Sequence, residues 1–249
     1  MKRFMLLTKA MVLSTLREPQ TLFWNLIFPV FWLVIYKVVF GRFLDSLPNG
    51  GGWILAGLIV LNLLSFGLIG SSAQMVEMRD KGVLRRLKTT PLPAWQVFVA
   101  YLINNVLVCL AQIAMLIGAG MLIAGAQLTL AGLLQALPMI LAGIVAFTAL
   151  GQVISSLAPK MGMALAIGQI FYFGQMFVTN LIMPLEAMPE AVRKVAVVLP
   201  GYLVGDLVRA PLLGNGWSSA TGWNLLLLLA YTVVAGLVAA RFFRWEPRA

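Results

Sequence analysis

The stretch that decides the fold is residues 53–93, WILAGLIVLNLLSFGLIGSSAQMVEMRDKGVLRRLKTTPLP. Its first part, residues 53–76, carries no charge and is long enough to cross the ~30 Å hydrocarbon core of a bilayer as a helix. Seven of the next twelve residues are charged, whereas the whole chain has only 18 basic and 8 acidic residues. The pattern predicts a transmembrane helix that ends near Val76, followed by a charged segment outside the bilayer.

The composition excludes a soluble domain. Of the 249 residues, 61% are hydrophobic and 10% are charged, whereas soluble domains carry about 25% charged residues. The chain has no histidine, so the commonest metal ligand and the usual general base near neutral pH are absent. Cys109 is the only cysteine and cannot form an intrachain disulfide.

The apolar stretches predict an all-α integral membrane protein with one domain over residues 1–249. Six transmembrane helices are expected, at residues 21–40, 53–76, 94–124, 131–157, 161–183 and 222–243. By segment, the prediction is an interfacial helix at 1–19, spans one and two at 20–76, the charged segment at 77–93, spans three to five at 94–183, short helices at 184–216 and the last span at 222–244.

Two segments do not fit spanning helices. At the N-terminus, Lys2, Lys9 and Arg17 fall within about 80° of one another on a helix, which predicts a helix lying along the membrane surface. Between spans five and six, residues 184–216 contain four prolines, which divide two short helix candidates at 190–199 and 202–213. Helices of this length are typical of re-entrant segments, so both are expected to dip into the membrane from one side.

The distribution of Lys and Arg predicts the orientation. If the N-terminus is cytoplasmic, 13 basic residues fall on the inside and 5 on the outside, which is a strong positive-inside bias. Both termini and the charged segment are then cytoplasmic, and residues 184–216 face outward. The net charge of +10 therefore needs no nucleic-acid partner to explain it.

Motifs for chemistry are missing from the sequence. It contains no GxxxxGK[ST] phosphate loop, no HExxH and no GxSxG motif, so we expect no catalytic residue, no metal site and no cofactor bound by this chain. No carboxylate lies at the centre of a span, which argues against a carrier driven by ions. A stand-alone channel or carrier and a membrane enzyme are the less favoured alternatives.

The charged segment has the pattern of a short amphipathic helix. Lys81, Arg85 and Lys88 are spaced to share a basic face, and Glu77 can pair with Lys81. The apolar face consists of Val83, Leu84 and Leu87. Acidic lipid headgroups would explain the basic residues. Because Glu77 and Asp80 are interleaved with them, a protein partner with complementary charge is favoured.

Polar residues inside the spans have two interpretations. Asn105, Cys109 and Gln112 share one face of span three, and a second stripe on span five consists of Gln169, Phe173, Met176 and Asn180. They could join helices through hydrogen bonds or line a translocation surface for an amphipathic substrate. Gly162, Gly168 and Gly174 are expected to allow close packing along span five.

The segment ExRDKGVLRRLKTTPL resembles the loop motif after the second span in membrane subunits of type-2 ABC exporters. The matching positions are Glu77, Arg79, Lys81, Gly82, Leu84, Leu87, Thr90, Pro91 and Leu92. The similarity continues along the chain in REP at 17–19, FP at 28–29 and the outer region at 183–209. Thr90 and Pro91 are expected to form the proline turn of the motif.

The resemblance implies a membrane subunit of the bacterial inner membrane that carries no ATPase site. It implies two copies of a separate ABC ATPase, which bind ATP and Mg, and a second membrane subunit, as a homodimer. Contact with the ATPase is expected at Glu77, Arg79, Asp80, Lys81, Gly82, Arg85, Arg86, Lys88 and Arg17. The substrate pathway is expected at Asn62, Ser65, Phe66, Gln169, Phe173, Met176, Phe177 and Asn180.

The substrate expected from the resemblance is amphipathic or hydrophobic, such as a drug, a peptide or a lipid-like molecule. Polysaccharide exporters of this class tend to have aromatic-rich channels and longer N-terminal segments, whereas the aromatic residues of this chain are spread along the sequence. Export of a polysaccharide or another cell-envelope precursor is the alternative.

Overall fold

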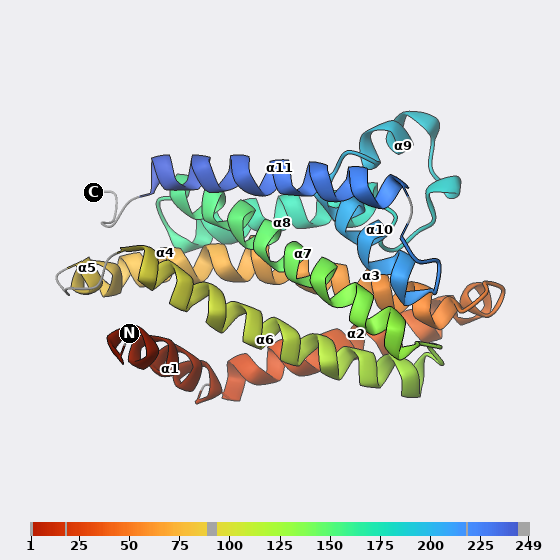
Figure 1. The fold of residues 1–249 in the computed structure, drawn as a ribbon, viewed down its shortest axis with the longest axis horizontal. Helices are drawn as coiled ribbons and strands as arrows, with labels where there is room; N and C mark the ends of the chain where they lie inside the picture. Colours follow the sequence, from red (N-terminus) through yellow and green to blue (C-terminus); the bar gives the residue numbers. More distant parts are fainter. Residues whose placement is uncertain (1, 18, 89–93, 218, 244–249) are drawn as a thin grey trace.

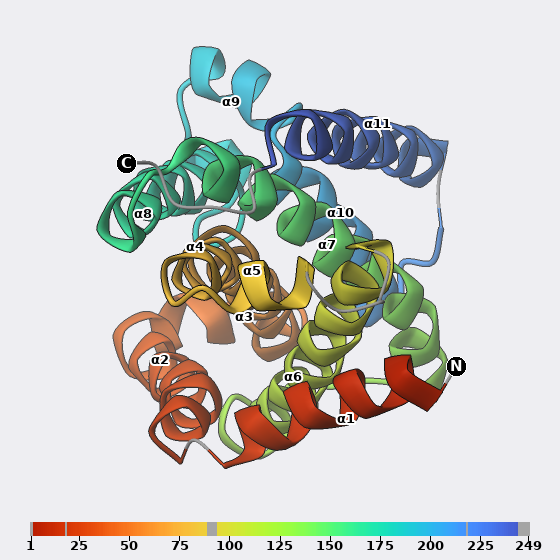
Figure 2. The same cartoon turned by 90° about the vertical axis from the view of Figure 1, so that its left-hand side faces the viewer.

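Long helices that run side by side along one common direction form the fold, as Figure 1 shows from the side and Figure 2 shows end-on. The computed structural model describes residues 2–17, 19–88, 94–217 and 219–243, and these residues form no strand. The helices are α1 (Lys2–Leu16), α2 (Pro19–Asp45), α3 (Gly50–Leu64), the π-helix η1 (Ser65–Ser71), α4 (Ser72–Asp80), α5 (Val83–Lys88), α6 (Ala94–Ile123), α7 (Leu130–Leu157), α8 (Met161–Val178), the 3-10 helix η2 (Leu185–Ala187), α9 (Glu190–Ala196), α10 (Pro200–Leu212) and α11 (Ser219–Phe242).

The charged segment and the short helices near residue 190 lie at opposite ends of the bundle. Figure 1 shows α5, the start of α8 and the end of α11 at one end, and α9 at the other. We call these the α5 end and the α9 end. This arrangement agrees with the side assignments expected from the sequence, although which side of a membrane each end faces stays a prediction.

Five helices of the described part are long and apolar enough to cross a membrane: Gly50–Asp80, Val99–Ile123, Leu130–Leu157, Met161–Val178 and Ala220–Phe242. The pair α9 and α10 is bent by 80°, as in a broken span or a re-entrant loop. Span one, predicted at 21–40, falls within α2, where several side chains lie outside the described part. The all-helical membrane class is therefore confirmed, and the count of six spans stays a prediction.

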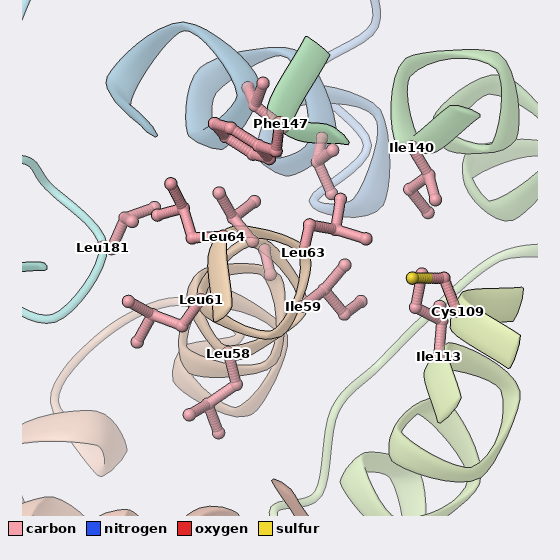
Figure 3. Packing of buried hydrophobic residues seen from close by; sticks show 14 of the residues in the cluster. Leu58, Ile59, Leu61, Leu63, Leu64, Cys109, Ile113, Ile140, Phe147 and Leu181 are labelled. Atoms are coloured by element: carbon pink, nitrogen blue, oxygen red, sulfur yellow. The ribbon is translucent and has the colours of Figure 1, made fainter. Parts of the chain in front are cut away.

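Span two lies at the centre of the bundle. The most apolar window of Gly50–Asp80 is 72% buried, compared with 11–44% for the other candidate spans. Figure 3 shows why: the side chains of α3 point in several directions, toward Phe147, Leu181 and Cys109 on three surrounding segments. A helix that is apolar on all sides can be buried either in lipid or in the interior of a bundle, and this helix lies in the interior and forms the core.

The π-helix η1 interrupts span two at the point where two other helices approach most closely. A Cβ atom added to Gly151 of α7 would lie 1.9 Å from the carbonyl oxygen of Gly67, and one added to Gly168 of α8 would lie 2.6 Å from that of Leu68. Small residues allow such contacts between membrane helices. The expectation for Gly168 is confirmed, but Gly162 and Gly174 have no described atom within 4 Å of an added Cβ, so their expected packing role is wrong.

At the α9 end, a buried arginine holds α10 against the rest of the bundle. Arg209 donates a hydrogen bond from Nη2 to the carbonyl oxygen of Asn180 at 2.9 Å, and its guanidinium lies 4.5 Å from the ring centroid of Trp53. Nearby, Asn224 of α11 donates a hydrogen bond to Asp206 at 2.7 Å. These contacts connect α10 to α3, to the segment that follows α8 and to α11, as expected for a charged side chain that must find partners in an apolar environment.

Candidate functional site

The charged segment is divided into two helices rather than one. The helix of span two continues past Val76 to Asp80, and the backbone then turns at Lys81 and Gly82 before α5 begins. Gly82 has a φ of +68° and donates a backbone hydrogen bond to Arg79 at 3.0 Å, which is the usual way for glycine to end a helix. The predicted single amphipathic helix over 77–88 is therefore wrong, because Gly82 interrupts it.

Arg79 is buried and holds the turn between α7 and α8. Its side chain is 5% exposed and donates hydrogen bonds to the carbonyl oxygens of Ser155, Ala158 and Pro159, at 3.2, 2.6 and 3.2 Å. A cation suits this position, because the last carbonyl groups of a helix have no partner within the helix and carry partial negative charge. Arg79 is predicted from the sequence to contact the ATPase. In this structure, its side chain instead joins the end of span two to the turn between spans four and five.

The other described charges of the segment are accessible. Asp80, Lys81 and Arg86 are exposed, and Glu77 is half-buried. The predicted pair is confirmed, because Lys81 Nζ lies 2.6 Å from Glu77 Oε1. A pair of this kind contributes only about 0.3–0.5 kcal/mol, so it orients the two side chains more than it stabilises the fold. The side chains of Arg85 and Lys88, and the turn predicted at Thr90 and Pro91, lie outside the described part of the chain.

The short helix α5 is attached to the bundle through Leu84. This side chain is 2% exposed and forms a small cluster with Met75 of α4 and Tyr101 of α6. The cluster also receives Met11 of α1 and Phe243 beside the end of α11. A force applied to α5 would therefore reach four helices. The expectation that Leu84 lies on the apolar face is confirmed.

Arg17 is separate from this group. It is exposed and follows the last residue of α1, at the α1–α2 junction, which lies away from α5 in both Figure 1 and Figure 2. Lys9 is also exposed on α1, as expected for a helix at a membrane surface. The structure therefore does not bring Arg17 together with the charges of α4 and α5.

The residues predicted for the substrate pathway lie on two neighbouring segments. Asn62, Ser65 and Phe66 are half-buried on one side of span two, and Gln74 continues the same side as an exposed residue. On α8, which packs against η1, the exposed residues Gln169, Phe173 and Phe177 are spaced four apart.

The rest of the predicted stripe departs from this surface. Met176 is half-buried and packs against the core. Helix α8 ends at Val178, so span five is shorter than the predicted 161–183, and Asn180 lies beyond the helix. The backbone of Asn180 accepts the hydrogen bond from Arg209, which draws this residue into the packing at the α9 end. The helical spacing of Asn180 with Phe173 and Met176 is therefore not realised.

Several other amides in the spans are buried by packing. Gln175 accepts a hydrogen bond from the backbone amide of Gly201 at 2.8 Å, which joins α8 to α10. Asn105, Cys109 and Gln112 are all at most 4% exposed, as expected for one inward face of α6. The expected hydrogen bond between helices is therefore confirmed for Gln175, whereas Asn105 and Gln112 Oε1 are buried without such a bond among the described residues. Gln169 is exposed, and the stripe of span two is half-buried.

Aromatic residues form two ladders rather than being spread out. On α2, the centroids of Phe28, Trp32, Tyr36 and Phe40 follow one another at 6.2, 5.9 and 5.6 Å. On α8, the ring of Phe173 lies 5.4 Å from Tyr172 and stacks on Phe177 at 6.4 Å. The four-residue spacing along α2 is visible in the sequence and could have predicted the first ladder.

Among the described residues, no three or more His, Cys, Asp or Glu side chains gather where they could hold a metal ion. What the α5 end offers is a short helix attached through Leu84, with exposed charges of both signs at Asp80, Lys81 and Arg86 on and beside it. Such a surface can bind a protein and transmit its movement.

Comparisons with known proteins identify the family. The model of the ABC-2 type transporter family matches residues 2–213. Over 231 residues, which is 90% of each chain, the sequence is 25% identical to a Bacillus subtilis (strain 168) protein named as a transport permease, YvfS. It is also 30% identical to nodulation protein J of Rhizobium leguminosarum bv. viciae over 112 residues, 45% of this chain and 43% of that protein. The chain belongs to the ABC-2 type transporter family, whose members are membrane transport components and are not themselves catalytic.

Proposed function

We propose that this chain is the transmembrane subunit of an ATP-driven exporter and that a separate ABC ATPase binds it at the α5 end. One observation carries the proposal: α5 is held by the buried Leu84 while Lys81 and Arg86 beside it are exposed. A helix with this division can bind a partner on its charged side and transmit force through its apolar side. Family membership supports an ABC ATPase as that partner.

The proposed assembly contains two copies of this chain and two copies of the ATPase, which binds ATP and Mg. The surface of a single chain supports a second membrane subunit, because amide groups such as Gln169 are exposed at the level of the spans. An amide facing lipid lacks hydrogen-bond partners, which is costly in hydrocarbon. A second copy that faces this surface would cover it and leave a path between the two chains.

The proposed pathway is the accessible part of the predicted set: Asn62, Ser65 and Phe66 on span two, and Gln169, Phe173 and Phe177 on α8. Exposed rings with a few amides suit a substrate that has an apolar body and polar groups. An amphipathic drug, peptide or lipid-like molecule is the first candidate. Met176, which is half-buried against the core as Phe66 is, lies at the edge of this set, and Asn180 is left out because it lies beyond α8 and its backbone binds Arg209.

The aromatic ladder on α2 favours a second candidate, a polysaccharide or another cell-envelope precursor. Three of its four rings, Phe28, Trp32 and Phe40, are 41–43% exposed, whereas Tyr36 between them is buried and supports the ladder from inside. Aromatic faces combine a large apolar area with specific stacking geometry, which suits flat or ring-shaped substrate groups.

The proposed location is the inner membrane of a bacterium, with the α5 end and both termini in the cytoplasm. The basic residues support this orientation through the positive-inside bias. The α9 end, which contains the bent pair α9 and α10, would then face outward.

The test is reconstitution of this chain in nanodiscs with an ABC ATPase encoded in the same genome. The expected result is ATP hydrolysis by the complex that responds to candidate amphipathic substrates, and no hydrolysis by this chain alone. Transport of such a substrate by the chain without any ATPase would overturn the proposal and favour a stand-alone carrier.

A further inference from the structure

The π-helix η1 separates the outer half of span two from its charged end. Residues Ser65–Ser71 have the wider π pairing, between the α-helical segments α3 and α4. A π-helical turn within an α-helix is rare, occurs often at functional sites and is one of the known causes of helix bending. In this chain it begins with Ser65 and Phe66 of the half-buried stripe, shortly after Asn62, and it leads toward the exposed charges beside α5.

Two serine hydroxyl groups donate hydrogen bonds to backbone carbonyl oxygens of η1. Ser71 Oγ donates to the carbonyl oxygen of Gly67 at 3.0 Å, and Ser72 Oγ donates to those of Leu68 and Ile69 at 2.6 and 3.1 Å. Serines that bond back to the preceding turn in this way often bend helices.

A neighbouring helix supports the same backbone. Tyr101 of α6 donates a hydrogen bond from its hydroxyl group to the carbonyl oxygen of Ser71 at 3.0 Å. Backbone groups within a membrane must be satisfied inside the protein, because lipid offers no hydrogen bonds. With hydroxyl groups on the carbonyls of Gly67, Leu68, Ile69 and Ser71, this segment can change its helical pairing at low cost.

The closest contacts of α7 and α8 with span two also lie at η1 and could act as a pivot. The contacts of Gly151 with the carbonyl oxygen of Gly67, and of Gly168 with that of Leu68, bring α7 and α8 onto η1. Side chains flank the Gly67–Gly151 contact, because a Cβ added to Gly67 would lie 2.5 Å from Cβ of Phe147, and Gln152 of α7 donates a hydrogen bond to Ser71 Oγ at 3.3 Å. Because no side chain stands between the two backbones at Gly67 and Gly151 themselves, the helices can turn about this point.

On the α5 side of this pivot, three segments are tied together. Arg79 binds the carbonyl oxygens of Ser155, Ala158 and Pro159, so the end of α4, the end of α7 and the start of α8 are held as one block. Leu84 attaches α5 to the same region. A force on α5 would therefore be transmitted to span two through this block. We expect span two to bend at η1, where its helical pairing changes.

We propose that η1 is a hinge at which the block held by Arg79 tilts about the Gly67–Gly151 contact, so that movement of α5 changes the stripe at Asn62, Ser65 and Phe66. The inference rests on the proposed function for the source of the push. The hinge itself is a property of this chain and can be tested without the ATPase.

The experiment measures the distance between spin labels on either side of the hinge. Labels are attached at Gln74→Cys and Gln135→Cys, two exposed positions on the α5 side and the α9 side, in a Cys109→Ala background. A control pair at Leu122→Cys and Gln135→Cys lies wholly on the α9 side.

The first arm uses the chain alone in nanodiscs. Tyr101→Phe leaves the carbonyl of Ser71 without its side-chain donor and should shift or broaden the Gln74–Gln135 distance by about 2 Å, a typical size for helix shifts. Ser72→Ala should act in the same direction. The matched controls are Tyr231→Phe and Thr232→Ala on α11, the second of which removes a similar hydroxyl bond to Leu228 at 2.8 Å. Equal distributions in all four variants would overturn the hinge.

The second arm uses the complex with the ABC ATPase, with and without ATP and vanadate. The Gln74–Gln135 distance should shift by about 2 Å on trapping, whereas the control pair should not. Deletion of Gly70, an exposed residue of η1, removes the residue that the wider turn accommodates and should abolish the shift. A shift that persists after this deletion would overturn the hinge. If the wild-type complex does not hydrolyse ATP, the proposed function fails and the first arm still decides the hinge.

Discussion

The guanidinium of Arg79 donates a hydrogen bond to the carbonyl oxygen of Ala158 at 2.6 Å, which ties the end of span two to the end of α7. Replacing Arg79 with Met removes three such bonds and leaves the carbonyls of the α7–α8 turn without this donor. Hydrogen bonds to a charged group contribute about 1.5–3 kcal/mol each, so a loss of about 2 kcal/mol or more is expected. The matched variant, Arg86→Met, changes an exposed side chain and should stay within about 0.5 kcal/mol. Thermal unfolding in detergent measures both, and equal midpoints would show that the Arg79 bonds are not needed for stability.

Reversing Arg85 and Arg86 to Glu tests the charged surface of α5. The chain should still insert, because the other basic residues preserve the orientation bias, but transport should be uncoupled from ATP hydrolysis. The control reverses Arg193 and Lys194 to Glu, two adjacent exposed residues on α9 at the opposite end of the bundle. Hydrolysis rates of the reconstituted complexes, with and without substrate, compare the two. Normal substrate-stimulated hydrolysis in the α5 variant would contradict a coupling role.

Phe173 tests the substrate surface. Its ring is 48% exposed on α8, so Phe173→Ala should alter which amphipathic compounds stimulate the complex while basal hydrolysis is kept. Phe242 is similarly exposed, at 51%, but lies at the end of α11, and Phe242→Ala should leave the selectivity profile unchanged. The same compounds are assayed on both variants. Matching profiles would favour a packing or lipid-facing role for Phe173.

The contact between Gly151 and Gly67 predicts intolerance to even a small side chain. An added Cβ at Gly151 would lie 1.9 Å from a backbone oxygen, so Gly151→Ala should force the helices apart and cost about 1–3 kcal/mol. Gly236 of α11 has no described atom within 4 Å of an added Cβ. Because alanine favours helices over glycine by up to about 1 kcal/mol, Gly236→Ala should be neutral or stabilising. Unfolding midpoints distinguish the two, and a neutral Gly151→Ala would show that the crossing relaxes easily.

The sequence predicts well those features that depend on hydrophobic length and helical spacing. Helices α6, α7 and α11 begin and end within three residues of the predicted spans, because their apolar runs have clear limits. The ion pairs of Glu77 with Lys81 and of Glu190 with Lys194 follow from four-residue spacing alone and are both present. The buried face at Asn105, Cys109 and Gln112 follows from the same geometry.

Features that depend on tertiary contacts could not be predicted in this way. Arg79 has the same local pattern as its exposed neighbours, and only the arrival of the α7–α8 turn buries it. The π-helix has no signal in the sequence, because Ser71 and Tyr101, whose contact supports it, are 30 residues apart. Asn180 does not share the predicted stripe, because α8 ends at Val178 and the backbone of Asn180 instead accepts a hydrogen bond from Arg209, 29 residues later. Gly82, by contrast, follows a charged helix end, and a glycine there is a signal that could have predicted the break.

The most direct measurement is site-specific photo-crosslinking of this chain to the ABC ATPase in the reconstituted complex. A benzophenone amino acid replaces Arg86 at the α5 end in one variant and Arg193 at the α9 end in the other, and both positions are exposed. We expect a cross-linked product with the ATPase from position 86 and none from position 193. A cross-link from position 193 with none from position 86 would contradict docking of the ATPase at the α5 end.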